Sequence, residues 1–73
     1  MNDYMMILAL LRSKTASLHT AETEREAREI DNELCRPLAK AMGRAYTMPQ
    51  GQRKVVLEMA IKQAVNTRRK MFA

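Results

Sequence analysis

The segment AREIDNELCRPLAKAMGRA, residues 27–45, carries apolar side chains at spacings of three and four along its whole length. Because an α-helix has 3.6 residues per turn, this spacing places them on one face of a helix about five turns long. We therefore predict a helix here whose apolar face packs against the rest of the chain. The face consists of Ala27, Ile30, Leu34, Leu38, Ala41 and Ala45.

A line of cations follows the same predicted helix. Arg36, Lys40 and Arg44 are each four residues apart, so they lie one above the other on the helix surface. Each residue turns the helix by about 100°, which puts this line well away from the apolar face and toward solvent. The helix therefore offers one face for folding and a separate basic edge for an anionic partner.

Pro37 lies inside this otherwise regular pattern. Proline lacks a backbone N–H, and its ring clashes with the carbonyl four residues earlier, that of Glu33, which costs about 3 kcal/mol in a helix interior. The apolar period nevertheless continues in phase across it, from Leu34 to Leu38. We expect either a kinked helix or two helices meeting at Arg36, and the continuous phase favours the kink.

The N-terminal region predicts a first helix that is apolar on nearly every side. Asn2 or Asp3 can cap it, and Tyr4, Ile7, Leu8 and Leu11 follow helical spacing. Such a helix is normally buried on more than one side. It is therefore either the central helix of the domain, or part of its surface is left for a partner. The partner surface would then consist of Met5, Ile7, Leu8 and Leu11.

A loop or a frayed helix end is predicted between the first helix and the second. Residues 12–20 lose helical periodicity and contain several Ser and Thr, which compete with helix by bonding to nearby backbone. Thr23, with Glu26 three residues later, has the spacing of a capping box. We therefore predict that the second helix begins between residues 20 and 23.

A linker at residues 46–51 contains Pro49 and Gly51 and separates the second helix from the last one. The last helix begins near Pro49 or Gln50, and its apolar stripe is Leu57, Ala60, Ile61, Ala64 and Val65. Two striped helices joined by a short linker pack as an antiparallel hairpin. We predict a single all-α domain over residues 1–73, with three or four helices built on that hairpin and no strands.

Composition indicates one small globular domain that folds by packing alone. The chain has 73 residues, 47% of them hydrophobic, and its seven Met side chains favour an adaptable core or an adaptable binding face. The single cysteine, Cys35, excludes an internal disulfide, and its place beside the apolar face predicts a buried, inert thiol. Since no segment reaches the roughly 20 apolar residues of a membrane span, we expect a cytoplasmic protein without a membrane partner.

No group of residues predicts catalysis. Cys35 and His19 would need an activated thiolate to act together, and we expect His19 to be a solvated loop residue instead. Four glutamates are spaced for a solvated helix surface and form no Glu-x-x-His pair, namely Glu22, Glu26, Glu29 and Glu33. With two glycines there is no phosphate-binding loop. We therefore expect no enzymatic activity, no cofactor, no metal and no small-molecule substrate.

Charge is divided unevenly along the chain. From Arg36 onward there are nine Lys and Arg residues and one acid, Glu58, a net charge of +8, whereas the preceding residues carry −3. This division predicts an anionic partner, either nucleic acid or an acidic protein surface. The alternative is that these cations only form the water-facing sides of two amphipathic helices.

A helix-turn-helix is disfavoured. Ala39 and Gly43 have the alanine-to-glycine spacing of that motif, but Pro49 would then lie inside the recognition helix and break it. The chain also has only three aromatic residues, too few and too scattered to stack successive bases. Contacts to any nucleic acid would therefore be made largely to phosphate.

Three functions fit these features. The first is a non-enzymatic regulator that binds the transcription apparatus, through RNA polymerase, DNA or both, by analogy with small basic regulators of phages and plasmids. The second is a helical co-chaperone or adaptor that covers a partner helix with the apolar N-terminal helix. The third is a homodimer that buries that helix in its own interface. The basic contact predicted for the first is Arg36, Lys40, Arg44, Arg53 and Lys54, extended by Arg68, Arg69 and Lys70.

Overall fold

In a computed structural model of the chain, the residues whose structure is described are 3–73. These residues contain three helices, α1 (Asp3–His19), α2 (Glu24–Thr47) and α3 (Gln52–Met71). Within residues 3–73 there is no β-strand, which confirms the predicted all-α class. Asp3 lies in the first turn of α1, whereas Asn2, the other predicted cap, lies outside the described residues.

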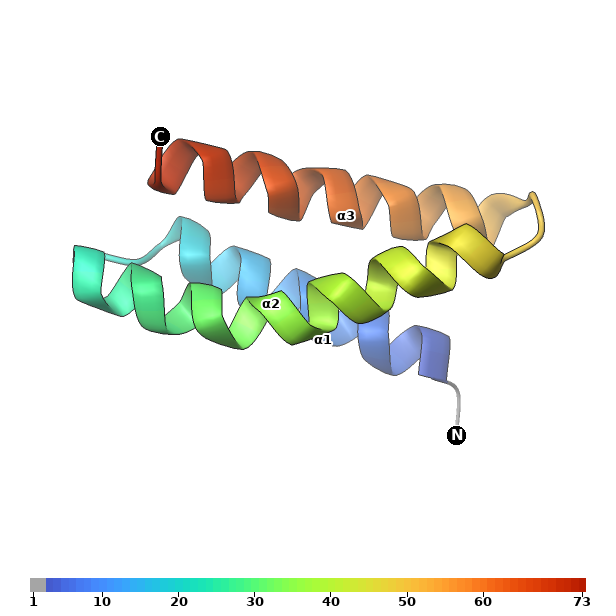
Figure 1. Cartoon of the computed structure of the whole chain (residues 1–73), viewed down its shortest axis with the longest axis horizontal. Helices are drawn as coiled ribbons and strands as arrows, with labels where there is room; N and C mark the ends of the chain where they lie inside the picture. The colour runs from blue at the N-terminus through green and yellow to red at the C-terminus, as the bar shows by residue number, and fades with distance from the viewer. Residues whose placement is uncertain (1–2) are drawn as a thin grey trace.

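The three helices lie alongside one another, and every pair of them is in contact (Figure 1). α2 runs opposite to α1 and α3, so α1 and α3 both begin at the end of the molecule where α2 finishes. Tyr4 Oη donates a hydrogen bond of 3.0 Å to the Arg53 carbonyl oxygen and so joins these two helix starts. The molecule measures 39 × 25 × 16 Å, and 16 Å is less than two helix diameters. No helix is therefore surrounded by the others.

Each helix contributes one stripe of side chains to a shared core. The spacing of the buried positions alternates between three and four residues, as in a coiled coil. The predicted stripe of residues 27–45 is the buried face of α2, apart from Ile30, which is only partly buried. The buried apolar residues are Tyr4, Leu8, Leu11 and Leu18 in α1, Ala27, Leu34, Leu38, Ala41 and Ala45 in α2, and Leu57, Ala60 and Ala64 in α3.

The first helix is longer than the sequence predicted. α1 continues to His19, so the predicted loop at residues 12–20 is wrong, and residues 20–23 make the connection to α2. Thr15 is buried, and its hydroxyl donates to the Leu11 carbonyl oxygen at 2.7 Å, which satisfies this polar group within its own helix. Leu18 is fully buried. Its packing outweighs the weak helix preference of the neighbouring Ser and Thr residues.

The second helix begins at its predicted cap and is continuous. The Thr23 hydroxyl accepts a hydrogen bond of 3.1 Å from the Glu26 backbone N–H, which confirms the N-cap. The helix runs unbroken to Thr47, so the alternative of two helices meeting at Arg36 is wrong. Pro37 is buried within it.

Residues 48–51 connect α2 to α3 and lie inside the predicted linker. Met48 has φ −75° and ψ 144°, the extended conformation that the following Pro49 imposes on its neighbour. α3 then begins at Gln52, slightly later than predicted. The short connection explains why α3 turns back along α2.

An ion pair joins the last part of α3 to α2. Arg68 donates to both Asp31 carboxylate oxygens, from Nε at 2.6 Å and from Nη2 at 3.3 Å. This hydrogen bonding raises the pKa of the Arg68 guanidinium above its ordinary value. The Asp31 side chain is only 17% exposed, so the pair is partly shielded from water. It fixes the position of α3 along the axis of α2.

We predict that Pro37→Ala keeps the fold and raises the free energy of unfolding by about 1 kcal/mol. Alanine is more favourable than proline in a helix interior by about 3 kcal/mol. The loss of two buried ring carbons offsets about 1.6 kcal/mol of that gain. Urea unfolding followed by circular dichroism measures the change.

The control for this substitution is Gly43→Ala in the same helix. A Cβ added at Gly43 meets no atom within 4 Å, so helix propensity alone should raise stability by about 1 kcal/mol. A lower free energy of unfolding for Pro37→Ala, or an altered denaturant slope, would show that the packing of the helices requires the proline.

The Asp31–Arg68 pair should contribute more than an ordinary surface ion pair. In a double-mutant cycle of Asp31→Ala and Arg68→Ala, we expect a coupling energy of about 1–1.5 kcal/mol, because two charge-assisted hydrogen bonds are lost from a partly shielded site. The exposed pair Glu24–Arg28, with its Nη2–Oε1 distance of 2.6 Å, is the control and should give about 0.3–0.5 kcal/mol. Equal coupling in the two cycles would contradict a special role for the Arg68 pair.

Candidate functional site

The predicted basic line forms one edge of a groove. Arg36, Lys40 and Arg44 are exposed on α2, and within residues 3–73 none of them forms an ion pair with a carboxylate. All three line an open groove of about 1090 Å³ between α1 and α2. We call Arg36, Lys40 and Arg44 the basic line.

The opposite wall of this groove is apolar and comes from α1. Met6 and Leu10 are 54% and 46% exposed there, and the partly buried Ile7 lies with them. Pro37 adds its buried ring from α2 to the same lining. We call Met6, Ile7, Leu10 and Pro37 the apolar wall. The α1–α2 groove therefore places the apolar wall directly beside the basic line.

Carboxylates occur only toward the two ends of the lining. Glu33 of α2 forms an ion pair with Lys14 of α1. This pair joins the two helices toward the C-terminal end of α1. Asp3 lies at the start of α1, near the other end. The middle of the groove thus keeps an uncompensated positive charge.

The predicted apolar partner surface requires correction. Leu8 and Leu11 belong to the core, with 6% and 0% of their surface exposed, so neither is available to a partner. Met5 is exposed but does not line the α1–α2 groove, and only Ile7 of the predicted set does. Met6 and Leu10 were missed. Because residues 4–11 of α1 are all apolar, no polar position among them marks which ones remain exposed.

Arg53 and Lys54 do not extend the basic line. The Arg53 guanidinium lies over the Tyr4 ring, 5.5 Å from its centroid, in a cation–π contact. Lys54 is partly buried, and its ammonium donates to the Met48 carbonyl oxygen at 3.5 Å. Both side chains thus make contacts within the protein, and neither lines the α1–α2 groove.

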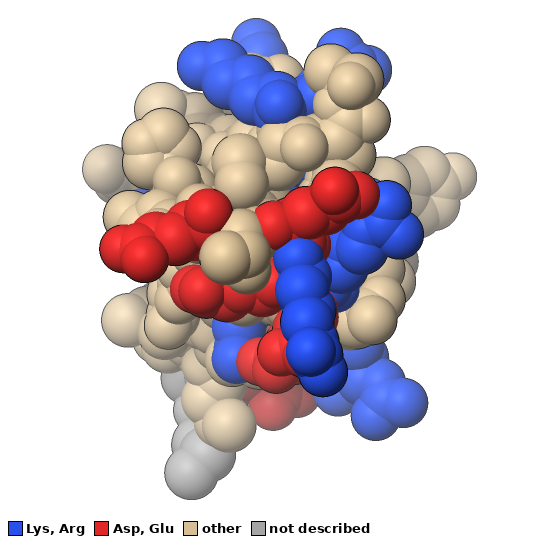
Figure 2. Space-filling view, turned by 90° about the vertical axis from the view of Figure 1, so that its left-hand side faces the viewer, with Lys and Arg blue, Asp and Glu red and all other residues tan. Residues whose placement is uncertain are grey.

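The last cations of the chain lie at the other end of the molecule. Arg68 is paired with Asp31, and Arg69 and Lys70 follow it at the end of α3, which lies beside the start of α2. Figure 2 looks onto this end and shows carboxylates interspersed with Lys and Arg side chains. These three residues therefore offset the acidic start of α2 and do not extend the basic line.

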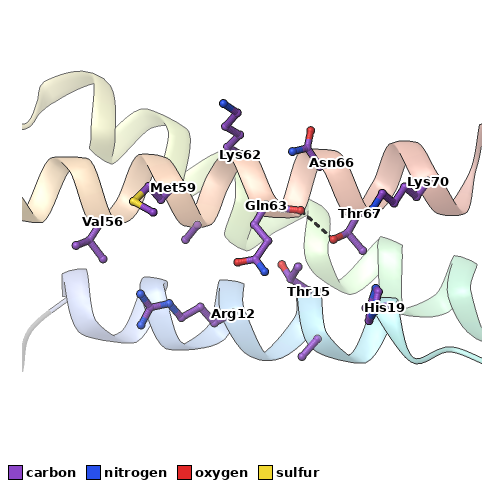
Figure 3. Close-up of a pocket in the computed structure, with 12 residues that line it drawn as sticks. Arg12, Thr15, His19, Val56, Met59, Lys62, Gln63, Asn66, Thr67 and Lys70 are labelled. Atoms are coloured by element: carbon purple, nitrogen blue, oxygen red, sulfur yellow. Dashed lines mark hydrogen bonds between the residues drawn. The ribbon is translucent and has the colours of Figure 1, made fainter.

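A second groove, of about 1020 Å³, lies between α1 and α3 (Figure 3). Its two buried hydroxyls are satisfied within their own helices, since Thr67 donates to the Gln63 carbonyl oxygen at 2.9 Å and Thr15 to that of Leu11. Its cations do not converge, because Lys62 points away from α1 while Arg12 lies along that helix. We therefore regard the α1–α2 groove as the better candidate.

Two residues considered for catalysis remain apart from any site. Cys35 is a free and exposed thiol, so the prediction of a buried cysteine is wrong. The core covers only the stripe through Leu34 and Leu38, and Cys35 lies next to that stripe on the solvent side. His19 is exposed as predicted, although it lies in the last turn of α1 and not in a loop.

Two features are absent from the described part of the chain, residues 3–73. None of its helices combines the length and the apolar character needed to cross a membrane. Across residues 3–73, no three His, Cys, Asp or Glu side chains gather in a way that could hold a metal ion.

Comparisons with protein-family models, with curated proteins and with solved structures found no match for this chain. Function is therefore inferred here from the chemistry of the α1–α2 groove, where a line of unpaired cations faces an exposed apolar strip.

Proposed function

We propose that this chain is a small, non-enzymatic, cytoplasmic regulator that binds an anionic partner in the transcription apparatus through the basic line. In this proposal the antiparallel pair of α2 and α3 is the frame that holds the line in place. RNA polymerase and DNA are the two partners that the charge pattern favours. The assignment to transcription rests on analogy with small basic regulators.

One observation carries the proposal. The cations of the basic line are collinear and exposed, and within residues 3–73 they have no carboxylate partner, whereas Lys14, Arg25, Arg28 and Arg68 each have one. Three unpaired cations in a row form a local positive potential that attracts and orients an anionic surface.

A second candidate function is an adaptor that covers a partner helix with its apolar N-terminal helix. The exposure of Met6 and Leu10 in the α1–α2 groove favours it. A homodimer that buries the same strip between two copies is the third. Neither of these functions needs the basic line, so charge reversal separates them from the first.

We predict that Arg36→Glu, Lys40→Glu and Arg44→Glu, combined in one variant, keep the fold and weaken partner binding about 100-fold. Each reversal removes an attraction of about 1 kcal/mol, and the total of about 3 kcal/mol corresponds to about 100-fold at 1.4 kcal/mol per factor of ten. Binding is measured by capture of partners from cell extract, with and without nuclease, and then by titration of the purified partner. For DNA, three phosphate contacts give a slope of log K against log[salt] of about −2.7.

The matched control reverses three exposed cations outside the α1–α2 groove, Arg12, Lys62 and Arg69, to glutamate. It changes net charge by the same amount and should retain most of the binding. If the basic-line variant binds its partner as tightly as the parent protein does, the cations only solvate α2 and the proposal fails.

A further inference from the structure

We propose that the α1–α2 groove binds an amphipathic helix of a partner protein that carries glutamate or aspartate along one edge. This inference rests on the proposed function, since it specifies the anionic partner as an acidic protein helix. The α1–α2 groove supplies the two features that such a helix requires, an apolar strip and a parallel row of cations.

The spacing of the cations matches a helical partner. Residues four apart in a helix are separated by about 6 Å along the axis, so Arg36 and Arg44 lie about 12 Å apart along α2. A partner helix with an acid at every fourth residue repeats the same 6 Å interval. Three carboxylates can therefore face the three members of the basic line at once.

The apolar wall supplies the second half of the recognition. Met6 and Leu10 are also four residues apart and remain about half exposed beside the partly buried Ile7. An amphipathic helix that lays its apolar edge on this strip places the neighbouring edge against the basic line. Methionine adapts its shape to different aliphatic partners. The α1–α2 groove therefore selects a partner helix by the relative position of its apolar edge and its acidic edge.

The chemistry of the α1–α2 groove favours protein over nucleic acid. A phosphate backbone has no row of aliphatic side chains to cover Met6 and Leu10, and the lining contains no aromatic ring on which a base could stack.

A second copy of this chain is a poorer occupant. The first half of α2 has acids at helical spacing, Glu26, Glu29 and Glu33, and so could offer the charge. Its exposed residues include no large hydrophobic side chain between residues 20 and 40, so it has no apolar edge for the strip. Self-association is therefore an outcome for the experiment to exclude.

The test uses a fluorescent helical peptide of about 16 residues, about 24 Å long. It carries glutamate at every fourth position along one edge and leucine at every fourth position along the adjacent edge. A control peptide has the same composition with both residues scattered around the helix, and a DNA duplex of equal charge is the third probe. We expect the parent protein to bind the patterned peptide at least tenfold more tightly than either control, in a one-to-one complex.

Variants separate the two halves of the site. Met6→Asp with Leu10→Asp should reduce peptide affinity at least tenfold, and the basic-line reversal should reduce it about 100-fold. Met59→Asp is the matched control, because Met59 is 66% exposed and lies in the α1–α3 groove, and it should leave affinity unchanged. Circular dichroism and urea unfolding of each variant show that the fold is retained.

Four results would overturn the inference. The first is equal binding of the scattered and the patterned peptide, and the second is preferential binding of the DNA duplex. The third is unchanged peptide affinity of a folded variant that carries the Met6 and Leu10 changes. The fourth is sedimentation of the parent protein as a dimer that these same two changes dissociate. After any of the first three results the basic line could still bind an anionic partner, so the proposed function would not be contradicted. The proposed function fails separately, when the basic-line variant keeps its cellular partner.

Discussion

Four leucines, Leu11, Leu18, Leu34 and Leu57, are the largest fully buried side chains of the one core that the three helices share, and burial of this core holds the helices together. Most of the other buried apolar positions of α2 and α3 are alanine, which lets helix backbones approach closely around these leucines. A chain of 73 residues cannot bury much more than this, because small domains keep a large fraction of their surface in contact with water. The position of every other side chain depends on this narrow core.

The narrowness of the core has a direct consequence for α1. Its buried stripe uses Tyr4, Leu8, Leu11 and Leu18, whereas Met5, Met6 and Leu10 have nothing to pack against within a molecule that is 16 Å thick. Met6 and Leu10 therefore stay at the surface, where the antiparallel course of α2 brings cations to their side. The apolar wall of the α1–α2 groove thus exists because α1 carries more apolar surface than the core can bury.

Charge and packing cooperate in the same way on α2. The first half of the helix is acidic, and the end of α3 returns to it with Arg68 paired to Asp31. The second half is basic and lies beside the apolar wall, where Asp3 at one end of the groove is the one carboxylate that α1 adds to the lining. α2 therefore has one half whose charges are compensated by ion pairs and one half whose cations are available to the proposed partner. Pro37 lies near the boundary between them and contributes its ring to the groove.

The sequence by itself determined the helical class, the Thr23 cap, the turn before α3 and the exposed basic line. Each of these depends on residues close together in the chain, through hydrogen bonds, proline geometry and 3.6-residue periodicity. Helical spacing already identified Tyr4, Leu8 and Leu11, which are buried. The tertiary structure alone decided that Met6 and Leu10 stay exposed, because residues 4–11 include no polar residue that marks the solvent side. It also kept residues 12–19 helical through the burial of Leu18, left Cys35 in solvent, and placed Arg68 at the acidic end. These outcomes depend on how the three helices pack against one another, and that packing is made by residues that are remote in sequence.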